Sequence, residues 1–411
     1  MSGETVRAMI KRLRRVHGWS QARLAEKLNE AARDLPELGL NANLSRHDVY
    51  RWESGLRKPR EWLPVLATVL GVSREQLEEA TAVGDVPPSP DPRTVDDFLP
   101  PGDPFAPLAG GLGPRIGRST VIDLAGRVHG LRLADDVVYG RDLIGRARRD
   151  LKSTVTLYRE TTHTEVIGRD LLRVIAELAQ IVGWVFSDAG EYAEADRVYR
   201  LGLSAAQKAQ DGTLAGQLLS TLSYQVANQG APSEAVEMAT AAVEIAGPDA
   251  PARARALFRD RAAWAHTKAG HPQEAIKALG TAHEALTDGH GADEPDWTYW
   301  VCVEELEVMD ARVYTELHKP LRAVPLLTHV LDRYEATHAR ELALYLSWLA
   351  VAYADANEPE EAAATARRML KLGTGGASER TAARGRVVLE RLTPFAKMPE
   401  VAALLSEFGT V

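Results

Sequence analysis

The sequence predicts an all-α protein, and three observations support that fold class. Alanine, leucine, arginine and glutamate, which all favour helices, dominate the 411 residues. Long runs that alternate β-branched and polar residues, as strands do, are hard to find. In the second half of the chain, small residues recur at a spacing typical of stacked helix pairs. We therefore expect helical domains throughout.

Charge is distributed unevenly along the chain. Residues 1–60 hold 13 Lys+Arg against 7 Asp+Glu, a net charge of +6, whereas the remainder holds 36 against 50, a net charge of −14. This asymmetry is expected if only the N-terminal part meets the phosphates of a nucleic acid. No signal-peptide core occurs, and no apolar run approaches the roughly 20 residues of a membrane span, so we expect a cytoplasmic protein that does not bind membranes. The single cysteine, Cys302, rules out an intramolecular disulfide, and its apolar surroundings predict a buried, inert thiol.

The first 80 residues contain five amphipathic segments, which we expect to form one domain. The first segment ends at Gly18, a residue that favours the left-handed turn after a helix. The next two begin with Ser20 and Ser45, which are placed to cap them, and Asp48 completes a carboxylate version of the capping box. The segments lie at about 5–17, 20–31, 45–55, 61–71 and 73–80. Apolar positions at helical spacing predict a core of Val6, Met9, Ile10, Leu13, Leu24, Ala25, Leu28, Val49, Trp52, Trp62, Leu66 and Leu70.

The third segment carries a polar face that suits a DNA major groove. On the side away from its apolar residues it presents Arg46, His47, Tyr50 and Arg51. Arginine donors match the two acceptors that guanine offers in that groove. The alternative is an ordinary solvated surface, on which single basic residues are common.

Residues 5–77, approximately, resemble the Xre/Cro family of helix-turn-helix repressors. The resemblance implies a recognition helix on which Arg46, His47 and Arg51 occupy base-reading positions, with Tyr50 close by. It also implies contacts with the DNA backbone from Gln21, Ser45, Arg57, Lys58 and Arg60. The segment ARDLPELGLNANL, residues 32–44, departs from the family by replacing its tight turn, and it leaves the relative pose of the two helices open.

A Pro/Gly-rich segment, residues 81–118, separates this domain, residues 1–80, from the rest. Nine prolines fall in the 28 residues from Pro87 to Pro114, and proline at that density withholds the donors that helices and sheets need. We therefore expect an extended, semi-stiff tether. Its end, GGLGPRIGRS, differs from a phosphate-binding loop at Leu112 and Arg118, so we interpret it as linker that leads into a helix capped by Ser119.

After a helical packing layer expected at 119–170, residues 171–411 contain a five-fold repeat. Its matched alanines, spaced by 40, 40, 48 and 39 residues, are Ala195, Ala235, Ala275, Ala323 and Ala362. Twelve residues before each stands a small residue: Gly183, Ser223, Ala263, Ala311 and Ala350. Five residues before each stands a candidate left-handed cap: Gly190, Gly230, Gly270, His318 and Asn357. Small residues let paired helices approach closely, so the pattern predicts stacked helix hairpins, followed by capping helices at 378–392 and 399–408.

This register resembles the tetratricopeptide repeat (TPR), with longer turns, and implies a TPR-like solenoid with a concave groove. Transferring the inward positions of the repeat gives the groove candidates Trp184, Asp188, Gln217, Tyr224, Asn228, Trp264, Lys268 and Arg312, and the column of inward positions that runs through Trp184, Tyr224, Trp264 and Arg312 ends at Val351. Stacked rings beside amides and charges suit a peptide or a small amphipathic molecule. In related receptors that sense short peptides, asparagines clamp the ligand, and Asn228 falls on a comparable position. Alternatively, the tryptophans only fill space between neighbouring helices.

Together these observations predict a sequence-specific transcriptional regulator that binds double-stranded DNA as a homodimer, on half-sites about one helical turn apart. Its TPR-like domain is expected to sense a peptide or small molecule, to bind a partner protein or to mediate dimerisation. We expect no cofactor, metal or catalysis, because His271, His283 and His290 lack metal-ligand spacing and no serine elbow or dinucleotide fingerprint occurs. The alternative is a TPR scaffold that recruits a partner protein, with the N-terminal domain as a protein-contact or tethering module.

Overall fold

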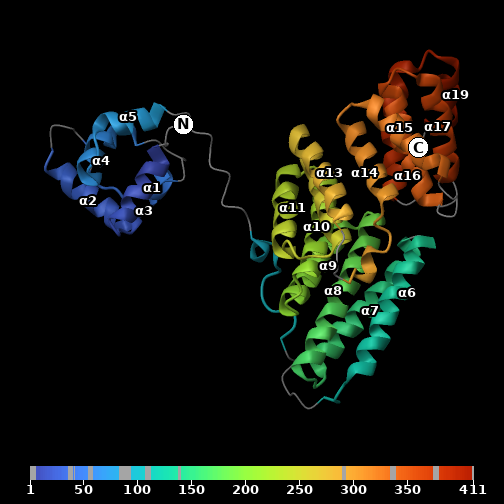
Figure 1. The fold of residues 1–411 in the computed structure, drawn as a ribbon, viewed down its shortest axis with the longest axis horizontal. Helices are drawn as coiled ribbons and strands as arrows, with labels where there is room; N and C mark the ends of the chain where they lie inside the picture. The colour runs from blue at the N-terminus through green and yellow to red at the C-terminus, as the bar shows by residue number, and fades with distance from the viewer. Residues whose placement is uncertain are drawn as a thin grey trace. The chain divides into compact units, whose positions relative to one another are not determined.

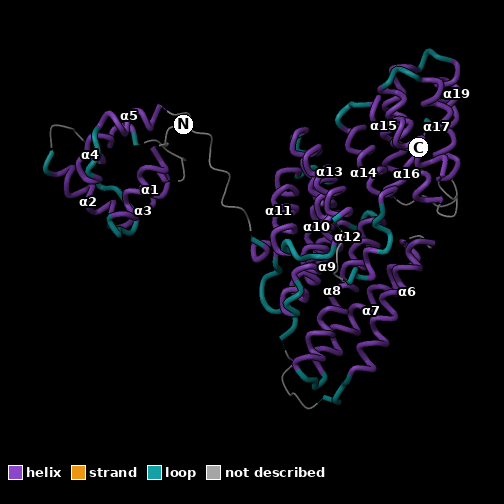
Figure 2. Tube along the Cα trace, viewed as in Figure 1, coloured by secondary structure: helices purple, strands orange, loops and turns teal. Residues whose placement is uncertain are grey.

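The computed structural model describes residues 6–35, 40, 42–53, 59–82, 94–106, 113–137, 140–288, 293–333, 339–373 and 379–409. Over these residues the chain is all-helical, as the sequence predicts, and the β-type pairing in them is confined to an isolated bridge between Arg115 and Thr162. The chain divides into two compact units, residues 1–92 and 93–411, and each unit has its own hydrophobic core. Figure 1 identifies the helices, and Figure 2 distinguishes them from the loops.

The first unit packs short helices around one small core (Figure 1). Its described elements are α1 Val6–Val16, α2 Gln21–Arg33, α3 Arg46–Glu53, the 3-10 turn η2 Arg60–Trp62, α4 Leu63–Leu70 and α5 Arg74–Ala82. Each predicted segment therefore forms one of the α-helices. The predicted core residues are buried, except that Met9 and Leu13 are half-buried at its edge.

The predicted helix ends of this unit are confirmed by local geometry. Gly18 adopts a φ of 69°, the left-handed conformation expected after α1. The Ser20 side chain caps α2 by accepting a hydrogen bond from the Arg23 amide at 3.1 Å. The Ser45 amide donates to Asp48 Oδ2 at 2.9 Å, as a capping box before α3 requires.

The segment between α2 and α3 is tied back to α2. The Asn29 side chain donates from Nδ2 to the Leu44 carbonyl and accepts from the Leu44 amide, both at 2.8 Å. Leu35, Leu40 and Ala42 also pack against the core of the unit. Two hydrogen bonds between the Asn29 side chain and the Leu44 backbone therefore hold the start of α3 against α2, which provides the local restraint that a tight turn would give.

The second unit is an array of helix pairs with two helices before it and two after it (Figures 1 and 2). Its described α-helices are α6 Arg118–Val137, α7 Gly140–Glu160, α8 Glu165–Asp188, α9 Tyr192–Lys208, α10 Gly212–Asn228, α11 Pro232–Ala246, α12 Ala252–Lys268, α13 Pro272–Thr287, α14 Val303–Glu316, α15 Pro320–Arg333, α16 Ala339–Asp355, α17 Pro359–Gly373, α18 Glu379–Leu392 and α19 Pro399–Phe408. Three 3-10 turns are η3 Val95–Phe98, η4 Asp296–Thr298 and η5 Thr393–Phe395. From α8 to α17, consecutive helices pack in pairs, while α6 and α7 both pack on α8. Among the described helices none combines the length and the apolar character that crossing a membrane requires.

The three predicted registers of the repeat are confirmed. All five matched alanines have no exposed surface, and the small residues twelve positions earlier are buried as well. All five predicted caps have a positive φ, including the non-glycine residues His318 at 53° and Asn357 at 62°. The pattern therefore marks helix pairs whose backbones approach closely and whose first helix ends in a left-handed residue.

The close approach is visible in two of the pairs. A Cβ atom added to Gly183 in α8 would collide with the ring of Tyr199 in α9, so only glycine fits there. In the next pair, Ser223 in α10 donates its hydroxyl hydrogen to the carbonyl of Ala235 in α11 at 2.7 Å. The missing side chain of Gly183 in the first pair and the buried hydrogen bond of Ser223 in the second both allow the two helices of a pair to approach closely.

The tether prediction for residues 81–118 is wrong for residues 94–106. Phe98, at the end of η3, is fully buried and Phe105 is 2% exposed, both in the core of the second unit. Arg200 of α9 donates to the Phe98 carbonyl at 2.9 Å, and Lys208 pairs with Asp103 at 2.8 Å. Two phenylalanines among the prolines thus hold this stretch against the array. The helix after it begins at Arg118 rather than after the predicted cap, Ser119.

Candidate functional site

Helix α3 has one buried and one exposed face. Val49 is fully buried and Trp52 is 3% exposed, and the Trp52 ring packs 6.1 Å from that of Trp62. Arg46 and Arg51 are exposed. The helix therefore presents two guanidinium groups to solvent from a backbone that is fixed on its other side.

A buried ion pair fixes the end of α3. Arg14 of α1 donates from Nε and Nη2 to the two carboxylate oxygens of Glu53, at 2.5 and 3.0 Å. Gln21 Nε2, at the start of α2, donates to the same carboxylate at 2.8 Å. Because these groups come from α1, α2 and α3, the network holds the three helices in register.

The structure describes the side chains of only some of the residues predicted to contact DNA. Gln21 has an internal partner in Glu53, and Ser45 pairs with Asp48 at the start of α3. His47 and Tyr50 lie within α3 and Arg60 begins η2, but their side chains are outside what the structure describes, as are Arg57 and Lys58 altogether. The roles of all these residues in DNA binding stay predictions.

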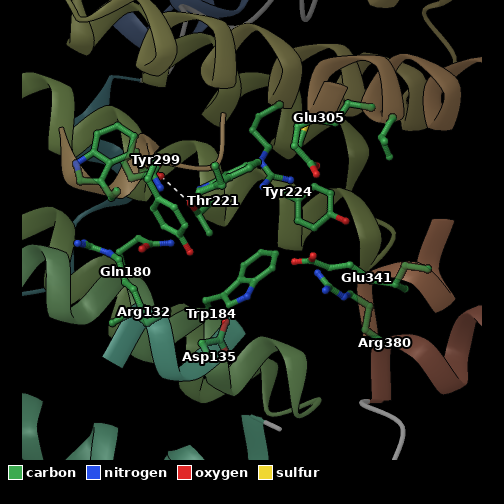
Figure 3. A pocket seen from close by; sticks show the side chains of 18 of the residues that line it. Arg132, Asp135, Gln180, Trp184, Thr221, Tyr224, Tyr299, Glu305, Glu341 and Arg380 are labelled. Atoms are coloured by element: carbon green, nitrogen blue, oxygen red, sulfur yellow. Dashed lines mark hydrogen bonds between the residues drawn. The ribbon is translucent and has the colours of Figure 1, made fainter. Parts of the chain in front are cut away.

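In the second unit, a cavity of about 520 Å³ lies between the first helices of the pairs. It is lined by Arg132, Asp135, Gln180, Ile181, Trp184, Gln217, Thr221, Tyr224, Arg261, Trp297, Tyr299, Trp300, Cys302, Glu305, Val308, Met309, Arg312, Glu341, Leu344, Tyr345 and Arg380. Figure 3 shows Trp184 of α8, Thr221 and Tyr224 of α10, and Tyr299 after η4 converging on this space. A volume of this size falls in the range of about 300–1,000 Å³ that small-molecule sites occupy.

A second cavity of about 280 Å³ adjoins the first and shares Trp184, Tyr224 and Arg312 with it. Between them, the two cavities bring together all eight predicted groove residues. Gln217 lines the larger one, whereas Asp188, Asn228, Trp264 and Lys268 line the smaller one. The register transfer thus locates the concave surface of the array, and ligand binding there stays a prediction.

The aromatic residues of the two cavities form a continuous series. The ring centroids of Trp184 and Tyr224 are 6.3 Å apart, and those of Tyr224 and Trp264 are 6.2 Å apart. The series continues to Trp348, 5.6 Å from Trp264 in an edge-on arrangement, and not to the predicted Val351, which is buried. Trp348 lies three residues before Val351 on α16, so the inward face of that helix is displaced by about one turn.

Guanidinium groups pack on this series of rings. Arg312 donates to the Tyr224 hydroxyl at 2.7 Å, and the Arg261 guanidinium lies 4.1 Å from the centre of the same ring. From α18, Arg380 lies over Trp184 at 5.0 Å and Arg384 over Trp348 at 3.4 Å. Sequence reasoning missed all of these except Arg312. Arg261 stands off the transferred register and α18 lies beyond the repeats, so no local pattern marks them.

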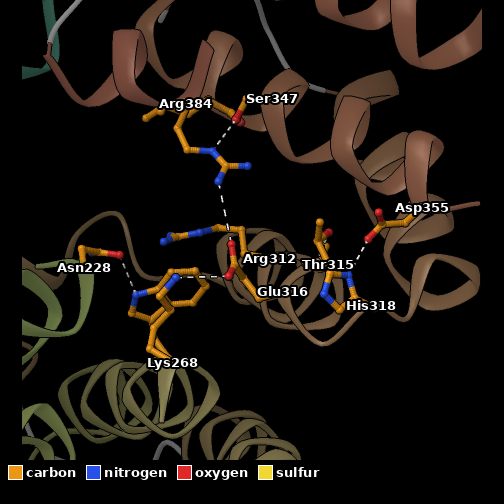
Figure 4. Close-up of polar contacts among 12 residues, drawn as sticks. Asn228, Lys268, Arg312, Thr315, Glu316, His318, Ser347, Asp355 and Arg384 are labelled. Atoms are coloured by element: carbon orange, nitrogen blue, oxygen red, sulfur yellow. Dashed lines mark hydrogen bonds and ion pairs between the residues drawn. The ribbon is translucent and has the colours of Figure 1, made fainter. Parts of the chain in front are cut away.

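Some predicted ligand-binding groups already have internal partners (Figure 4). Asn228 donates to the Tyr224 carbonyl at 2.8 Å and accepts from Trp264 Nε1 at 3.2 Å. Lys268 pairs with Glu316 at 3.2 Å. The same carboxylate lies 3.8 Å from Arg384 of α18. These contacts link α10, α12, α14 and α18 around the smaller cavity.

The charges shift the ionisation of neighbouring groups. Burial alone would raise the pKa of Tyr224, but Arg312, Arg380 and Arg261 outweigh it and lower that pKa to about 8. Burial raises the pKa of Asp260 to about 6 and that of Glu305 to about 7. At Tyr224 the arginine charges thus outweigh burial and favour the anion, whereas at Asp260 and Glu305 burial prevails and favours the neutral acid.

The sequence has no match among protein-family models, and a comparison with curated proteins gives no match either. Among the described residues, no group of three or more His, Cys, Asp or Glu side chains is placed to hold a metal ion. Cys302 is half-buried in the cavity wall, and burial raises the pKa of its thiol. A raised pKa opposes formation of the nucleophilic thiolate.

Proposed function

We propose that this protein is a sequence-specific, DNA-binding transcriptional regulator whose second unit binds an effector. In this proposal the first unit is an Xre/Cro-type helix-turn-helix domain with α3 as its recognition helix, and the second is a TPR-like solenoid. The exposure of Arg46 and Arg51 on a helix whose opposite face is buried carries the proposal. Arginine on a rigid helix can read guanine only if the helix itself is fixed, and the Asn29 and Glu53 contacts fix it.

Placement of charge, rather than total charge, supports DNA binding. Residues 1–92 hold 14 Lys+Arg against 13 Asp+Glu, so the unit as a whole is nearly neutral. The acidic excess comes after residue 60, where Arg74 stands alone against six Asp+Glu. Residues 1–60 keep their net charge of +6. A net positive charge over the segment that contains α3 is the distribution that phosphate contacts need.

A single recognition helix reads few base pairs, so the proposal includes a homodimer on two half-sites about one helical turn apart. An effector in the second unit can regulate such a dimer only through different affinities for its DNA-bound and free states. The contacts from α18 to α8 and α14 supply elements that a bound molecule could displace, since Arg380 pairs with Asp188 at 3.4 Å.

The test begins with selection of duplexes from a random pool by the full-length protein, followed by binding measurements on the selected site. Arg46→Ala should lose about 1–3 kcal/mol of discrimination at one base step. Lys58→Ala should weaken binding to all duplexes alike. Arg74→Ala is the matched control, because Arg74 is exposed on α5 and pairs with Glu78.

Two results would contradict the proposal. One is a wild-type protein with no preference between the selected duplex and bulk competitor, which would leave the alternative of a repeat scaffold that recruits a partner protein. The other is an equal loss on specific and random duplexes for Arg46→Ala, which would show that α3 does not read bases.

A further inference from the structure

We propose that the larger cavity of the second unit is a site for a small aromatic anion, with Arg261 as the residue that recognises its charge. This inference rests on the effector-binding half of the proposed function and is independent of DNA binding. Its basis is an arrangement of buried donors that the protein itself does not satisfy.

Arg261 is the central observation. Its side chain, on α12, is 7% exposed and stacks on Tyr224, yet it makes no hydrogen bond or ion pair with any described residue. A guanidinium has five N–H donors, and burying them without acceptors is costly. Its neighbour Asp260 does not pair with it, and burial raises the pKa of that carboxyl to about 6. The acceptor that Arg261 lacks must therefore come from the cavity that it lines.

Single atoms of other side chains in the wall are also without hydrogen-bond partners. Within the described structure they are Nε of Arg132, Nε of Arg312 and Oε1 of Gln217, whereas Nε of Arg380 lies 3.4 Å from Asp188. Gln217 is 4% exposed and Arg132 is 6% exposed, so water reaches them poorly. Two of the three atoms belong to guanidinium groups, and both arginines line the cavity, so the wall carries the kind of donor group that pairs with an anion with several oxygen atoms.

The charge balance of the wall also favours an anion. Of the four arginines that line the cavity, Arg132 pairs with Glu177 at 2.8 Å and Arg380 with Asp188 at 3.4 Å, whereas Arg261 and Arg312 have no ion pair with a described carboxylate. Glu305 accepts from the Tyr345 hydroxyl at 2.8 Å, and burial raises its pKa to about 7, so it is partly neutral near pH 7. The lowered pKa of Tyr224 reports the same positive field at an oxygen atom in the wall.

The remaining wall selects for a flat, apolar body. Trp184, Tyr224, Trp297, Tyr299 and Trp300 all line the cavity, and Tyr299 is 44% exposed. A planar molecule gains contact area from such rings at a small cost in conformational entropy.

The experiment compares two fluorescent probes that share one ring system. Anilinonaphthalene sulfonate carries a negative charge, whereas phenylnaphthylamine has the same rings without the sulfonate. Both are titrated into the folded, full-length protein, and the Kd and stoichiometry are measured. Because Cys302 is the only cysteine of the chain and lines the cavity, its alkylation by excess maleimide, read as one added mass, reports whether each probe occupies this site.

We expect one sulfonate probe per chain, bound at least about tenfold more tightly than the neutral probe, and slower alkylation of Cys302. Arg261→Met should remove about tenfold or more of the affinity for the sulfonate and change the affinity for the neutral probe less than about twofold. Arg259→Met is the matched control, since Arg259 lies on the same helix but is exposed. It should change neither affinity.

The outcomes separate this inference from the proposed function. Equal affinity for the two probes, both protecting Cys302, would overturn the preference for an anion while leaving the cavity an effector site. Sulfonate binding that neither protects Cys302 nor responds to Arg261→Met would overturn the inference, because the probe would then be bound elsewhere. If neither probe protects Cys302, the cavity does not admit aromatic molecules of this size, and both this inference and the effector role of the cavity fail.

Discussion

Arg14 in the first unit and Arg261 in the second are both largely buried, but only Arg14 has a described carboxylate partner that neutralises its charge. Arg14 makes two hydrogen bonds to the Glu53 carboxylate, and the two side chains are 12% and 4% exposed. Arg261 has an aromatic ring below it and no carboxylate partner in the described structure. A neutralised guanidinium can hold helices together without any other molecule. One that is not neutralised raises the free energy of the empty protein, which is reasonable only where something else supplies the charge.

The largest expected effect comes from breaking the neutralised pair. Glu53→Ala leaves Arg14 buried without a counter-charge and removes the partner of Gln21, so it should destabilise the first unit by about 3–5 kcal/mol. The two units need not unfold together, so hydrogen exchange of peptides from α1, α2 and α3 is the appropriate measurement. Arg14→Met combined with Glu53→Leu should recover most of the loss, because no charge is then left unpaired. A cost below about 1 kcal/mol for Glu53→Ala would mean that Arg14 is solvated and that the contrast with Arg261 is false.

The second prediction concerns Arg261, where we expect substitution to leave stability unchanged or to increase it. Arg261→Met removes a charge that has no carboxylate partner while keeping most of the side-chain volume, so the ligand-free protein should be unchanged or more stable by up to about 1 kcal/mol. Hydrogen exchange of α12 peptides measures this, with Arg259→Met as the exposed control. A loss of more than about 2 kcal/mol would show that Arg261 is a structural residue. In that case a missing ligand would not explain why Arg261 lacks an ion pair.

The same contrast separates what the sequence could predict from what it could not. The five caps, from Gly190 to Asn357, and the alanines beginning at Ala195 follow from steric demands that repeat in every pair, so a single chain displays them several times. Even His318 could be assigned a left-handed conformation because four other units required one at that position. The groove residues follow from the same register, since the inward face of each first helix is fixed by its packing.

Contacts that occur once could not be predicted. The prolines around Phe98 indicate an extended chain, but its burial depends on an apolar surface of the array that no local pattern specifies. Arg380 reaches Asp188 and Trp184 only because the array brings α18 next to α8. The shift from Val351 to Trp348, about one turn along α16, depends on the position of that helix along its axis, which periodicity alone does not fix. Arg261 stands out only in the structure, which shows that it is buried without an ion pair to any described residue.

The smallest expected effect is a dependence on pH that arises from Glu305 in the wall of the larger cavity. Burial, with a further contribution from Glu341, raises the pKa of Glu305 to about 7, although the Tyr345 hydrogen bond opposes the shift. A raised carboxyl pKa means that the folded protein favours the neutral acid. Its contribution to stability is full below the unfolded pKa of 4.5 and is lost as pH rises through about 7.

An anion in the cavity should favour the neutral form of Glu305 as well. Affinity for the sulfonate probe should therefore fall about two- to fivefold between about pH 6 and about pH 8, although the probe itself stays fully charged. Glu305→Gln should reduce this fall in affinity, and the dependence that remains should come from Asp260, whose pKa is about 6, and from Tyr224, whose pKa is about 8. Affinity that rises with pH in this window would contradict the account, because it would require the cavity to become more positive as its carboxyl and phenol groups lose protons.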